Sequence, residues 1–289
     1  MEGELWDALY RVLWQEAKQR TRRRRVCYSD GLILLVYCWS VLHDRPRCWA
    51  CRRENWPASM AWLRLPTEAT LSRRMRTVSV MLLLANLVHR LVALRTAALV
   101  RKVDSKPLVV GGFSKDRDAK RGYAAGQMAR GYKLFCVWGR GVMPDAAMIG
   151  PMNLSDPHAA AVLVPQLAGS GYLLADVAYD SNPLHAVTGP CGFQLLAPRK
   201  QPGTGLGHQS HEPSRLRSIE LLEGESDFGR RLYAQRGEIE RDLGHAGNFG
   251  GGLQPLPNWV RRPHRVVPWV MTKLVLNALR ICGNQSLAA

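Results

Sequence analysis

Ala98-Leu-Val-Arg-Lys-Val-Asp104 is a β-type run that ends at a carboxylate, and Tyr172-Leu-Leu-Ala-Asp176 ends in the same way. Three further β-type runs occur at residues 133–138, 141–149 and 193–197. Helix signals separate the later runs, so the order is three strands, helix, strand, helix, strand and helix. This order predicts a mixed α/β layer fold for residues 98–289, with a five-stranded sheet flanked by helices.

The helices between and after these runs have recognisable start signals. Asp156-Pro157 and Ser181-Asn-Pro183 each combine a capping residue with a proline in the first turn, which predicts helices there with Asp156 as a cap. A helix is expected over about 228–243, capped by Ser226 or Asp227, and an apolar helix over 268–282. Between the last strand and the helix at 228 lies a short insertion, about residues 198–226, whose part 201–213 is predicted to be a flexible connection.

Residues 1–97 have no convincing strand pattern and are predicted to form an all-helical DNA-binding region. Ser29-Asp30 can cap a helix that begins near Gly31. A turn at Leu65-Pro66 precedes a helix from Thr67 that carries Arg73, Arg74 and Arg76. This helix is either part of a DNA-reading helix-turn-helix or a solvated cationic helix. Together with the overall charge and the basic cluster Arg22–Arg25, it favours DNA contact.

The net charge of the chain is strongly positive. Forty Lys and Arg residues face twenty-three Asp and Glu residues, which gives +17. Such an excess favours a polyanionic partner, because binding releases the counterions condensed on phosphates. A merely soluble surface or a membrane-surface protein are the alternatives, and the dominance of Arg favours the polyanion. Lys106 and Lys133 are candidates to line the path of DNA, although most surface lysines have no specific role.

Membrane insertion and secretion are not expected. The start of the chain has Glu2, Glu4 and Asp7 rather than a signal peptide, and its apolar stretches are too short or too charged to span a bilayer. Seven cysteines, an odd number, fit a reducing cytoplasm. Cys48-Trp-Ala-Cys51 has the spacing of a zinc pair but no second pair near it, so two core residues are the preferred interpretation.

The carboxylates suggest phosphodiester chemistry. Two aspartates that leave strands, Asp104 and Asp176, and a glutamate on a later helix, Glu240, can approach one another from a sheet and a helix packed on it. Carboxylates are the preferred ligands of hard divalent cations, and two such cations can activate the attacking oxygen and stabilise the leaving one. A lone aspartate after a strand is more often a turn residue, so the trio depends on its order and its neighbours.

Four other carboxylates are rivals or bystanders. Asp180 directly precedes a helix and is better explained as a cap or turn residue. Glu238 lies two residues before Glu240 and is expected to point away from the helix face of Tyr233 and Arg236. Asp116 and Asp118 lie in a Lys/Arg-rich loop and are expected to be solvated.

The blocks around these carboxylates resemble those of insertion-sequence DDE transposases, in particular the subgroup with a Tyr-x-x-Arg-x-x-x-Glu helix. Tyr233, Arg236 and Glu240 have that spacing, and residues 103–108 and 175–181 resemble the two aspartate blocks. The resemblance covers roughly residues 25–282. Positions 233, 236 and 240 also share one helix face by geometry alone, although Tyr233 taken by itself would be half-buried packing.

The resemblance implies an RNase H-like catalytic core and cutting and joining at terminal inverted repeats. Asp104, Asp176 and Glu240 would hold Mg²⁺ or Mn²⁺, in all two ions, and Tyr233 and Arg236 would contact the DNA backbone. The expected partners are double-stranded terminal repeats and target DNA, bound by at least a dimer. The expected location is the bacterial cytoplasm, in association with the nucleoid.

One departure from the family pattern leaves alternatives open. The motif continues with a basic residue seven positions after the glutamate, where this chain has Gly247. Arg241 or the pair Arg261-Arg262 would have to substitute, or this copy is impaired. The chain could therefore be an inactive or repurposed DNA-binding protein, and an RNase H-like nuclease or resolvase without transposition is the third possibility.

Overall fold

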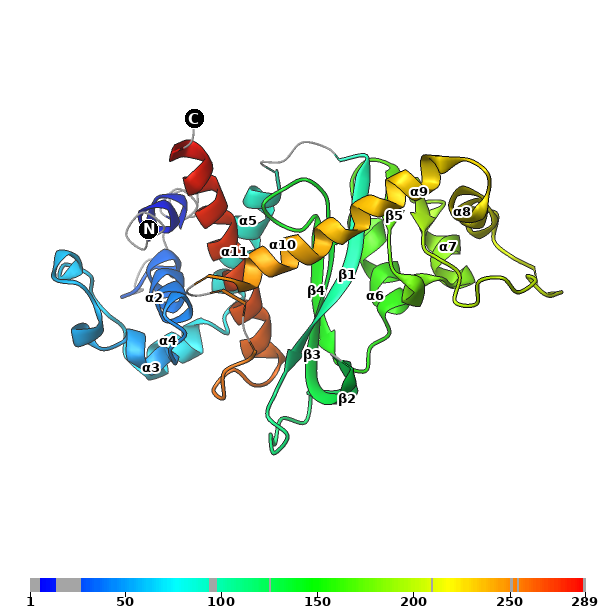
Figure 1. Cartoon of the computed structure of the whole chain (residues 1–289). Helices are drawn as coiled ribbons and strands as arrows, with labels where there is room; N and C mark the ends of the chain where they lie inside the picture. The colour runs from blue at the N-terminus through cyan, green and yellow to red at the C-terminus, as the bar shows by residue number, and fades with distance from the viewer. Residues whose placement is uncertain are drawn as a thin grey trace. The chain divides into compact units, whose positions relative to one another are not determined.

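The computed structural model describes residues 6–13, 27–93, 98–124, 126–208, 210–249, 252–253 and 255–287 (Figure 1). The basic cluster Arg22–Arg25 lies outside these residues. The chain forms two compact units: unit 1 contains Met1–Leu94 and His245–Ala289, and unit 2 contains Arg95–Gly244. Unit 1 therefore includes a C-terminal segment that the sequence ranges 1–97 and 98–289 assign to the other part of the chain.

Unit 2 contains one six-stranded mixed sheet with the strand order β2-β3-β1-β5-β6, in which β4 also pairs with β3. The strands are β1 Val100–Val109, β2 Lys120–Ala124, β3 Gln127–Trp138, β4 Ala146–Pro151, β5 Gly171–Leu174 and β6 Phe193–Leu196. Strand β3 pairs with β1, β2 and β4 in antiparallel ladders. Strand β5 pairs with β1 and with β6 in parallel ladders. The mixed sheet flanked by helices is confirmed. The additional strand, β2, begins Lys-Arg-Gly and has no apolar run that would predict it.

The two faces of the sheet bury different sets of side chains because successive residues of a strand point to opposite faces. Leu173 and Leu195 belong to the larger core, which α6 (Asp156–Leu163) and α7 (Asn182–Thr188) cover. Their neighbours Leu174 and Leu196 face the other way and contact Leu232. This second face is therefore the one that the later helices cover.

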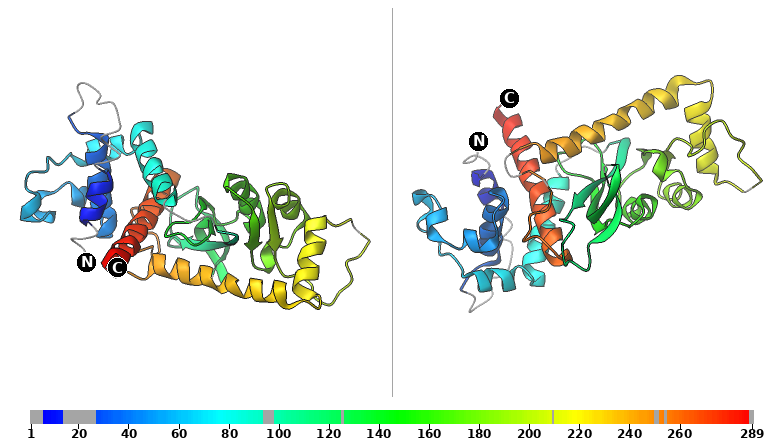
Figure 2. Two further views of the ribbon diagram at one scale, coloured as in Figure 1. Left: turned by 90° about the horizontal axis from the view of Figure 1, so that it is seen from above. Right: turned by 60° about the horizontal axis from the view of Figure 1, so that its bottom comes forward.

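A nearly continuous helical segment crosses this second face (Figure 2). It consists of α9 (Asp227–Tyr233), one 3₁₀ turn η5 (Ala234–Gly237) and the start of α10 (Glu238–Gly247). Ser226 caps α9 by accepting a hydrogen bond from the Phe228 N–H, as predicted. An additional helix, α8 (Pro213–Glu223), lies within the predicted insertion. The remaining 3₁₀ turns of unit 2 are η3 Val164–Gln166 and η4 Val177–Tyr179.

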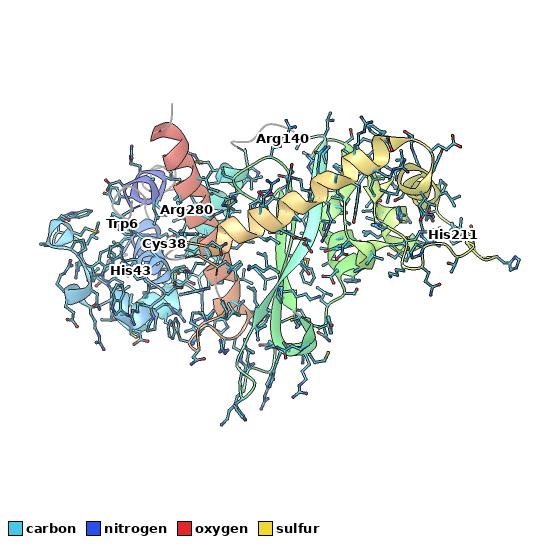
Figure 3. The ribbon with its side chains drawn as sticks, in the orientation of Figure 1. Trp6, Cys38, His43, Arg140, His211 and Arg280 are labelled. Carbon is cyan, nitrogen blue, oxygen red and sulfur yellow. The ribbon has the colours of Figure 1, made fainter. Side chains whose placement is uncertain are left out.

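The described part of unit 1 is helical. Residues 6–13 form a helix, and the other elements are α2 Asp30–Leu42, α3 Arg47–Ala50, η1 Arg53–Asn55, η2 Ala58–Met60, α4 Glu68–Arg74, α5 Val78–Ala93 and α11 Pro263–Leu287. Ser29 caps α2 and Thr67 caps α4, which confirms both predicted helix starts. Aromatic rings pack in the core: the Trp39 ring centroid lies 4.8 Å from that of Trp6 and 4.2 Å from that of His43. Figure 3 labels Trp6 and His43.

The last helix packs against α2 and α5. It begins at Pro263, five residues before the predicted start, and tolerates Pro268 inside its second turn. Its buried Lys273 donates to the Val41 carbonyl at 2.8 Å and to Asp44 at 2.6 Å. These contacts explain why the C-terminal segment belongs to unit 1.

No single helix in the described ranges combines the length and the hydropathy needed to cross a membrane. The helices Glu68–Arg74 and Val78–Val92, bent by 68° at the break between them, pass that test only as a pair.

Candidate active site

The strand pairing brings two of the predicted carboxylates to the same place. The last parallel pair between β1 and β5 is Lys102 with Leu174. Asp104 and Asp176 each lie two residues beyond that pair, so both lie just past the carboxyl end of the parallel ladder. The sequence suggested that Asp104 ends its strand, which is wrong. Strand β1 continues to Val109 because it stays paired with β3.

Each aspartate is held by a backbone N–H. The Ser105 N–H donates to Asp104 Oδ1 at 2.8 Å, and the Ala178 N–H donates to Asp176 Oδ1 at 2.9 Å. The second bond makes Asp176 the cap of η4. In both residues the other oxygen, Oδ2, is directed toward Arg236.

Arg236 connects the aspartates to the helical segment. Its Nη2 lies 3.6 Å from Asp104 Oδ2 and 3.9 Å from Asp176 Oδ2, while its Nη1 lies 3.5 Å from Glu240 Oε1. The guanidinium is largely buried, and its Nε has no hydrogen-bond partner. A single cation therefore lies among the three carboxylates that the sequence predicts.

Burial sets the electrostatics of the site. It raises the pKa of the Asp104 carboxyl, and the nearby Asp176 carboxylate raises that pKa further. The Ser105 N–H and Arg236 act in the opposite direction but do not cancel the rise. Ionised Asp104 is thus costly in the absence of a closer cation.

Of the other predicted DNA contacts, Lys106 shares a strand face with Asp104, whereas Tyr233 and Lys133 are engaged within the protein. Lys106 lies on the same face of β1 as Asp104, because their positions differ by two residues. Tyr233 is half-buried beside the Leu174, Leu196 and Leu232 cluster, and burial raises the pKa of its hydroxyl. Lys133 donates to Asp156 at 3.1 Å, so this lysine is held at the start of α6. Asp156 therefore pairs with Lys133 and does not cap α6, which is preceded by Ser155.

The three arginines near α4 in unit 1 differ in their surroundings. Arg73 and Arg76 are exposed. Arg74 is engaged inside the unit, where it donates to the Tyr28 carbonyl and to Asp30. Its guanidinium therefore fastens α4 to the start of α2.

The rival carboxylates have structural partners. Asp180 accepts two hydrogen bonds from Arg215, at 2.6 and 2.8 Å, and one from the Lys200 N–H. Glu238 pairs with Lys102 at 2.5 Å and so points away from Arg236, as expected. The expectation that Asp116 is solvated is wrong: it is buried and accepts a hydrogen bond from the Tyr132 hydroxyl, because its loop folds back on β3.

Residues 96–264 match the family model described as Transposase DDE domain, which is more than half of the chain. The chain belongs to this transposase family. A comparison of the DDE transposase with curated proteins finds no match. Among solved structures, it is similar to a chain of the "piggyBac transposase synaptic complex with hairpin DNA", with a TM-score of 0.48 and 10% identity over 99% of this chain and 73% of that chain.

DDE transposases in general use divalent metal ions, so the fit of this site to such ions matters. Among the residues that the structure describes, no group of three or more His, Cys, Asp and Glu side chains is arranged to hold a metal ion. The donors nevertheless suit a hard cation, since all three are carboxylates. The poorly satisfied Arg236 guanidinium lies between them, and its Nε is left without a partner. The chemistry of these donors therefore fits a divalent metal ion, and Arg236 lies in the position between them.

The sequence did not indicate the ion pair of Lys102 with Glu238. Lys102 is buried in β1 and shares its face with Asp104, while Glu238 opens α10 two residues before Glu240. This pair ties the strand of one candidate ligand to the helix of another. An apolar run interrupted by Arg101-Lys102 was the available signal, because a charge inside a buried strand requires a partner.

Proposed function

We propose that the chain is a transposase that cleaves phosphodiesters at the ends of its own element and transfers the freed 3′-hydroxyl to target DNA. The observation that carries this proposal is the convergence of Asp104, Asp176 and Glu240 on Arg236. The net charge of +17 supports a DNA substrate. The protein is expected to act on DNA in the bacterial cytoplasm, at the nucleoid. At least a dimer would hold the two DNA ends.

In this proposal Asp104, Asp176 and Glu240 hold two divalent ions, Mg²⁺ or Mn²⁺. Bound ions would supply an activated water oxygen and charge neutralisation at the leaving oxygen. Arg236 would release the carboxylates and take a phosphate of the DNA, for which its guanidinium is well suited. Tyr233 would pack beside the DNA strand that carries this phosphate, and Lys106 would lie along the path of that DNA strand.

Both steps are in-line displacements at phosphorus. In the first, a water oxygen forms a bond to phosphorus and the 3′-oxygen of the element leaves as a hydroxyl. In the second, that hydroxyl oxygen bonds to a target phosphorus and displaces the 3′-oxygen of the target strand. The helical region of residues 1–97 would bind the terminal repeats, and Arg73 and Arg76 are exposed for that contact.

The test uses the full chain, Mg²⁺ and a duplex that contains the DNA flanking its gene. Wild type should nick the element end and join it to a second labelled duplex, whereas Asp104→Asn should bind the duplex and not nick it. Nicking without joining would indicate a nuclease or resolvase. Binding without nicking by wild type would indicate the repurposed DNA-binding protein, which Gly247 at the expected basic position motivates.

A further inference from the structure

Three arginines and one histidine gather in unit 1. Arg47 begins α3, Arg76 follows α4, and His264 with Arg265 lies in the first turn of α11. Arg47, His264 and Arg265 line one small pocket together with Met75, the residue before Arg76. Segments that are about two hundred residues apart in sequence thus build one cationic cluster, defined here as Arg47, Arg76, His264 and Arg265.

The charges in this cluster are close enough to affect one another. Burial lowers the pKa of the Arg47 guanidinium, and Arg265 and Arg76 lower it further. Burial also lowers the pKa of His264, to which Arg265, Arg76, Arg47 and Arg262 add. Like charges held together repel, so the cluster is unfavourable without an anion beside it.

The surrounding protein does little to neutralise the cluster. Glu68 is the acidic side chain that acts on Arg47. Within the described ranges, Arg47, Arg76 and Arg265 have no carboxylate within ion-pair distance; Arg265 donates to the Trp259 carbonyl and Arg76 to the Ser72 carbonyl. Arg74, two residues before Arg76, differs from these arginines because it is paired with Asp30.

The pocket is too small to enclose a whole phosphate group, so an anion bound here would lie mainly on the surface above it. Its volume of about 20 Å³ suits a group the size of a water molecule, so it cannot enclose a nucleotide. His264 and Arg265 are exposed, and Trp259 beside them is 37% exposed. A phosphate oxygen of a long polyanion can enter from solvent while the rest of that polyanion continues along the surface.

We infer that this cationic cluster binds the sugar-phosphate backbone of DNA. The inference rests on the proposed function and deepens it, because it extends the DNA contact of unit 1 from α4 to the start of α11. Each arginine would contact phosphate oxygens, with Trp259 beside the adjoining sugar. Such contacts position DNA without reading its sequence.

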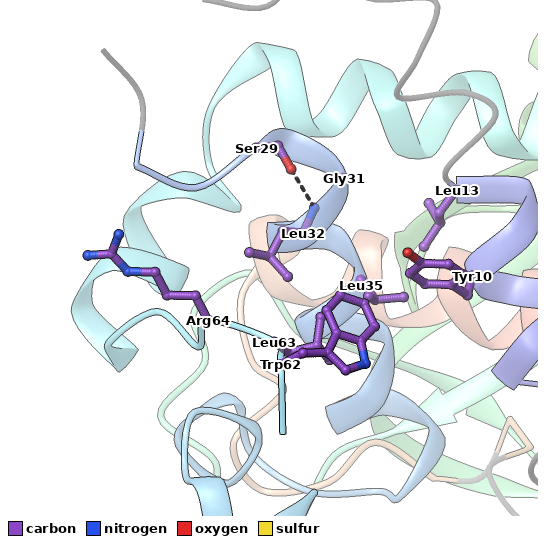
Figure 4. Close-up of a pocket in the computed structure, with 9 residues that line it drawn as sticks. All are labelled: Tyr10, Leu13, Ser29, Gly31, Leu32, Leu35, Trp62, Leu63 and Arg64. Carbon is purple, nitrogen blue, oxygen red and sulfur yellow. Dashed lines mark hydrogen bonds between the residues drawn. The ribbon is translucent and has the colours of Figure 1, made fainter. Parts of the chain in front are cut away.

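Another cavity in unit 1 has a different character (Figure 4). It has a volume of about 180 Å³ and an apolar lining in which Arg64 is the cationic side chain. Leu13, Leu32, Leu35 and Leu63 are among its lining residues. It therefore offers no set of donors for phosphate, and the inference concerns the cationic cluster alone.

The experiment measures binding of the full chain to a fluorescein-labelled duplex of about 30 base pairs, by anisotropy, from about 50 to 200 mM salt. Arg265→Gln and the double variant Arg47→Gln/Arg265→Gln are compared with wild type. The control is Arg52→Gln, which removes the same charge from an exposed side chain paired with Glu54 at 4.0 Å. Arg265 is exposed, so its single variant is expected to fold, and thermal melts check this for the double variant.

Each lost phosphate contact should reduce the magnitude of the salt slope by about 1, and the double variant should bind about 10- to 100-fold more weakly. The control should bind like wild type. Equal slopes for Arg265→Gln and the control would overturn the inference, including the case in which the cluster takes only free phosphate. If wild type nicks DNA and the variants bind it normally, the inference alone fails; if wild type does not bind duplex DNA, the proposed function fails with it.

Discussion

Arg236 Nη2 lies 3.6 Å from Asp104 Oδ2, across the gap between the helical segment and β1. The same nitrogen lies 3.9 Å from Asp176 Oδ2. A guanidinium therefore takes the position between the two aspartates that a divalent cation would need. Metal binding and Arg236 are expected to compete for these carboxylates.

This competition predicts that Arg236→Gln binds metal more tightly than wild type. Removing the cation leaves the carboxylates uncompensated, which raises their affinity for Mn²⁺ by roughly 3- to 10-fold. Titration calorimetry of the DNA-free protein measures this affinity. DNA nicking should nevertheless fall by about 10- to 100-fold, because the arginine that we propose to take the phosphate is lost. Weaker Mn²⁺ binding in Arg236→Gln would contradict the competition.

Asp104→Asn should stabilise the metal-free protein at neutral pH while it removes nicking. Burial raises the pKa of Asp104, so the ionised form is disfavoured in the folded state, and the isosteric amide avoids that charge. An increase in Tm of roughly 1–4 °C is expected in thermal unfolding with a chelator present. Asp118→Asn, a change in a loop of unit 2, is the comparison. A clear loss of stability in Asp104→Asn would show that its pairing with Arg236 outweighs its burial.

Glu238→Gln should loosen the helix that carries Glu240. Lys102 is 5% exposed and donates to Glu238 at 2.5 Å, so neutralising the glutamate leaves a buried ammonium without its anion. We expect a loss of about 1 kcal/mol in denaturant unfolding and about a 10-fold slower nicking rate with unchanged DNA affinity. Glu225→Gln, a change of an exposed glutamate between α8 and α9, should change neither quantity. Wild-type nicking in Glu238→Gln would mean that the pair does not position α10.

Asp180→Ala should destabilise unit 2 and change its acid stability. Burial alone would raise the pKa of Asp180, but the Arg215 and Lys200 hydrogen bonds outweigh it and the pKa is lowered. The stabilisation is therefore fully present above the unfolded value of about 3.9 and is lost as the pH falls through the lower folded value.

We expect Asp180→Ala to lose about 3 kcal/mol at neutral pH, with a difference from wild type that narrows below about pH 4. Unfolding by urea across this pH range measures it. Asp227→Ala breaks a pair of the same length, 2.6 Å, but an exposed one, and should have little effect. Equal losses in the two variants would contradict the structural role of Asp180.

The sequence predicts the features of this fold that depend on local patterns. The predicted helix starts at Ser29, Thr67 and Ser226 are each correct, because a capping side chain at these positions satisfies the first N–H groups of its own helix. The β-type runs likewise mark five of the strands, with shifted ends. The sequence did not predict strand β2 because its first residues are polar. This strand forms through its antiparallel pairing with β3.

Features that depend on distant partners could not be predicted. Asp156 has the sequence context of a cap, yet Lys133 on β3 takes its carboxylate. The position of Arg236 among three carboxylates follows from the β1–β5 register and from the crossing of the helical segment, neither of which a local pattern contains. The same reason explains why the 1–97 boundary did not include α11, whose buried Lys273 finds its partners near α2.

The central claim is that Asp104, together with Asp176 and Glu240, holds the catalytic metal ions, and a change of ligand tests it most directly. In Asp104→Cys a soft thiolate replaces a hard carboxylate, so Mg²⁺ should no longer support nicking while Mn²⁺, which accepts softer ligands, should restore part of it. Asp104→Ala should nick with neither ion. Nicking by Asp104→Cys at the wild-type rate in Mg²⁺, or no difference between the two ions, would contradict the account.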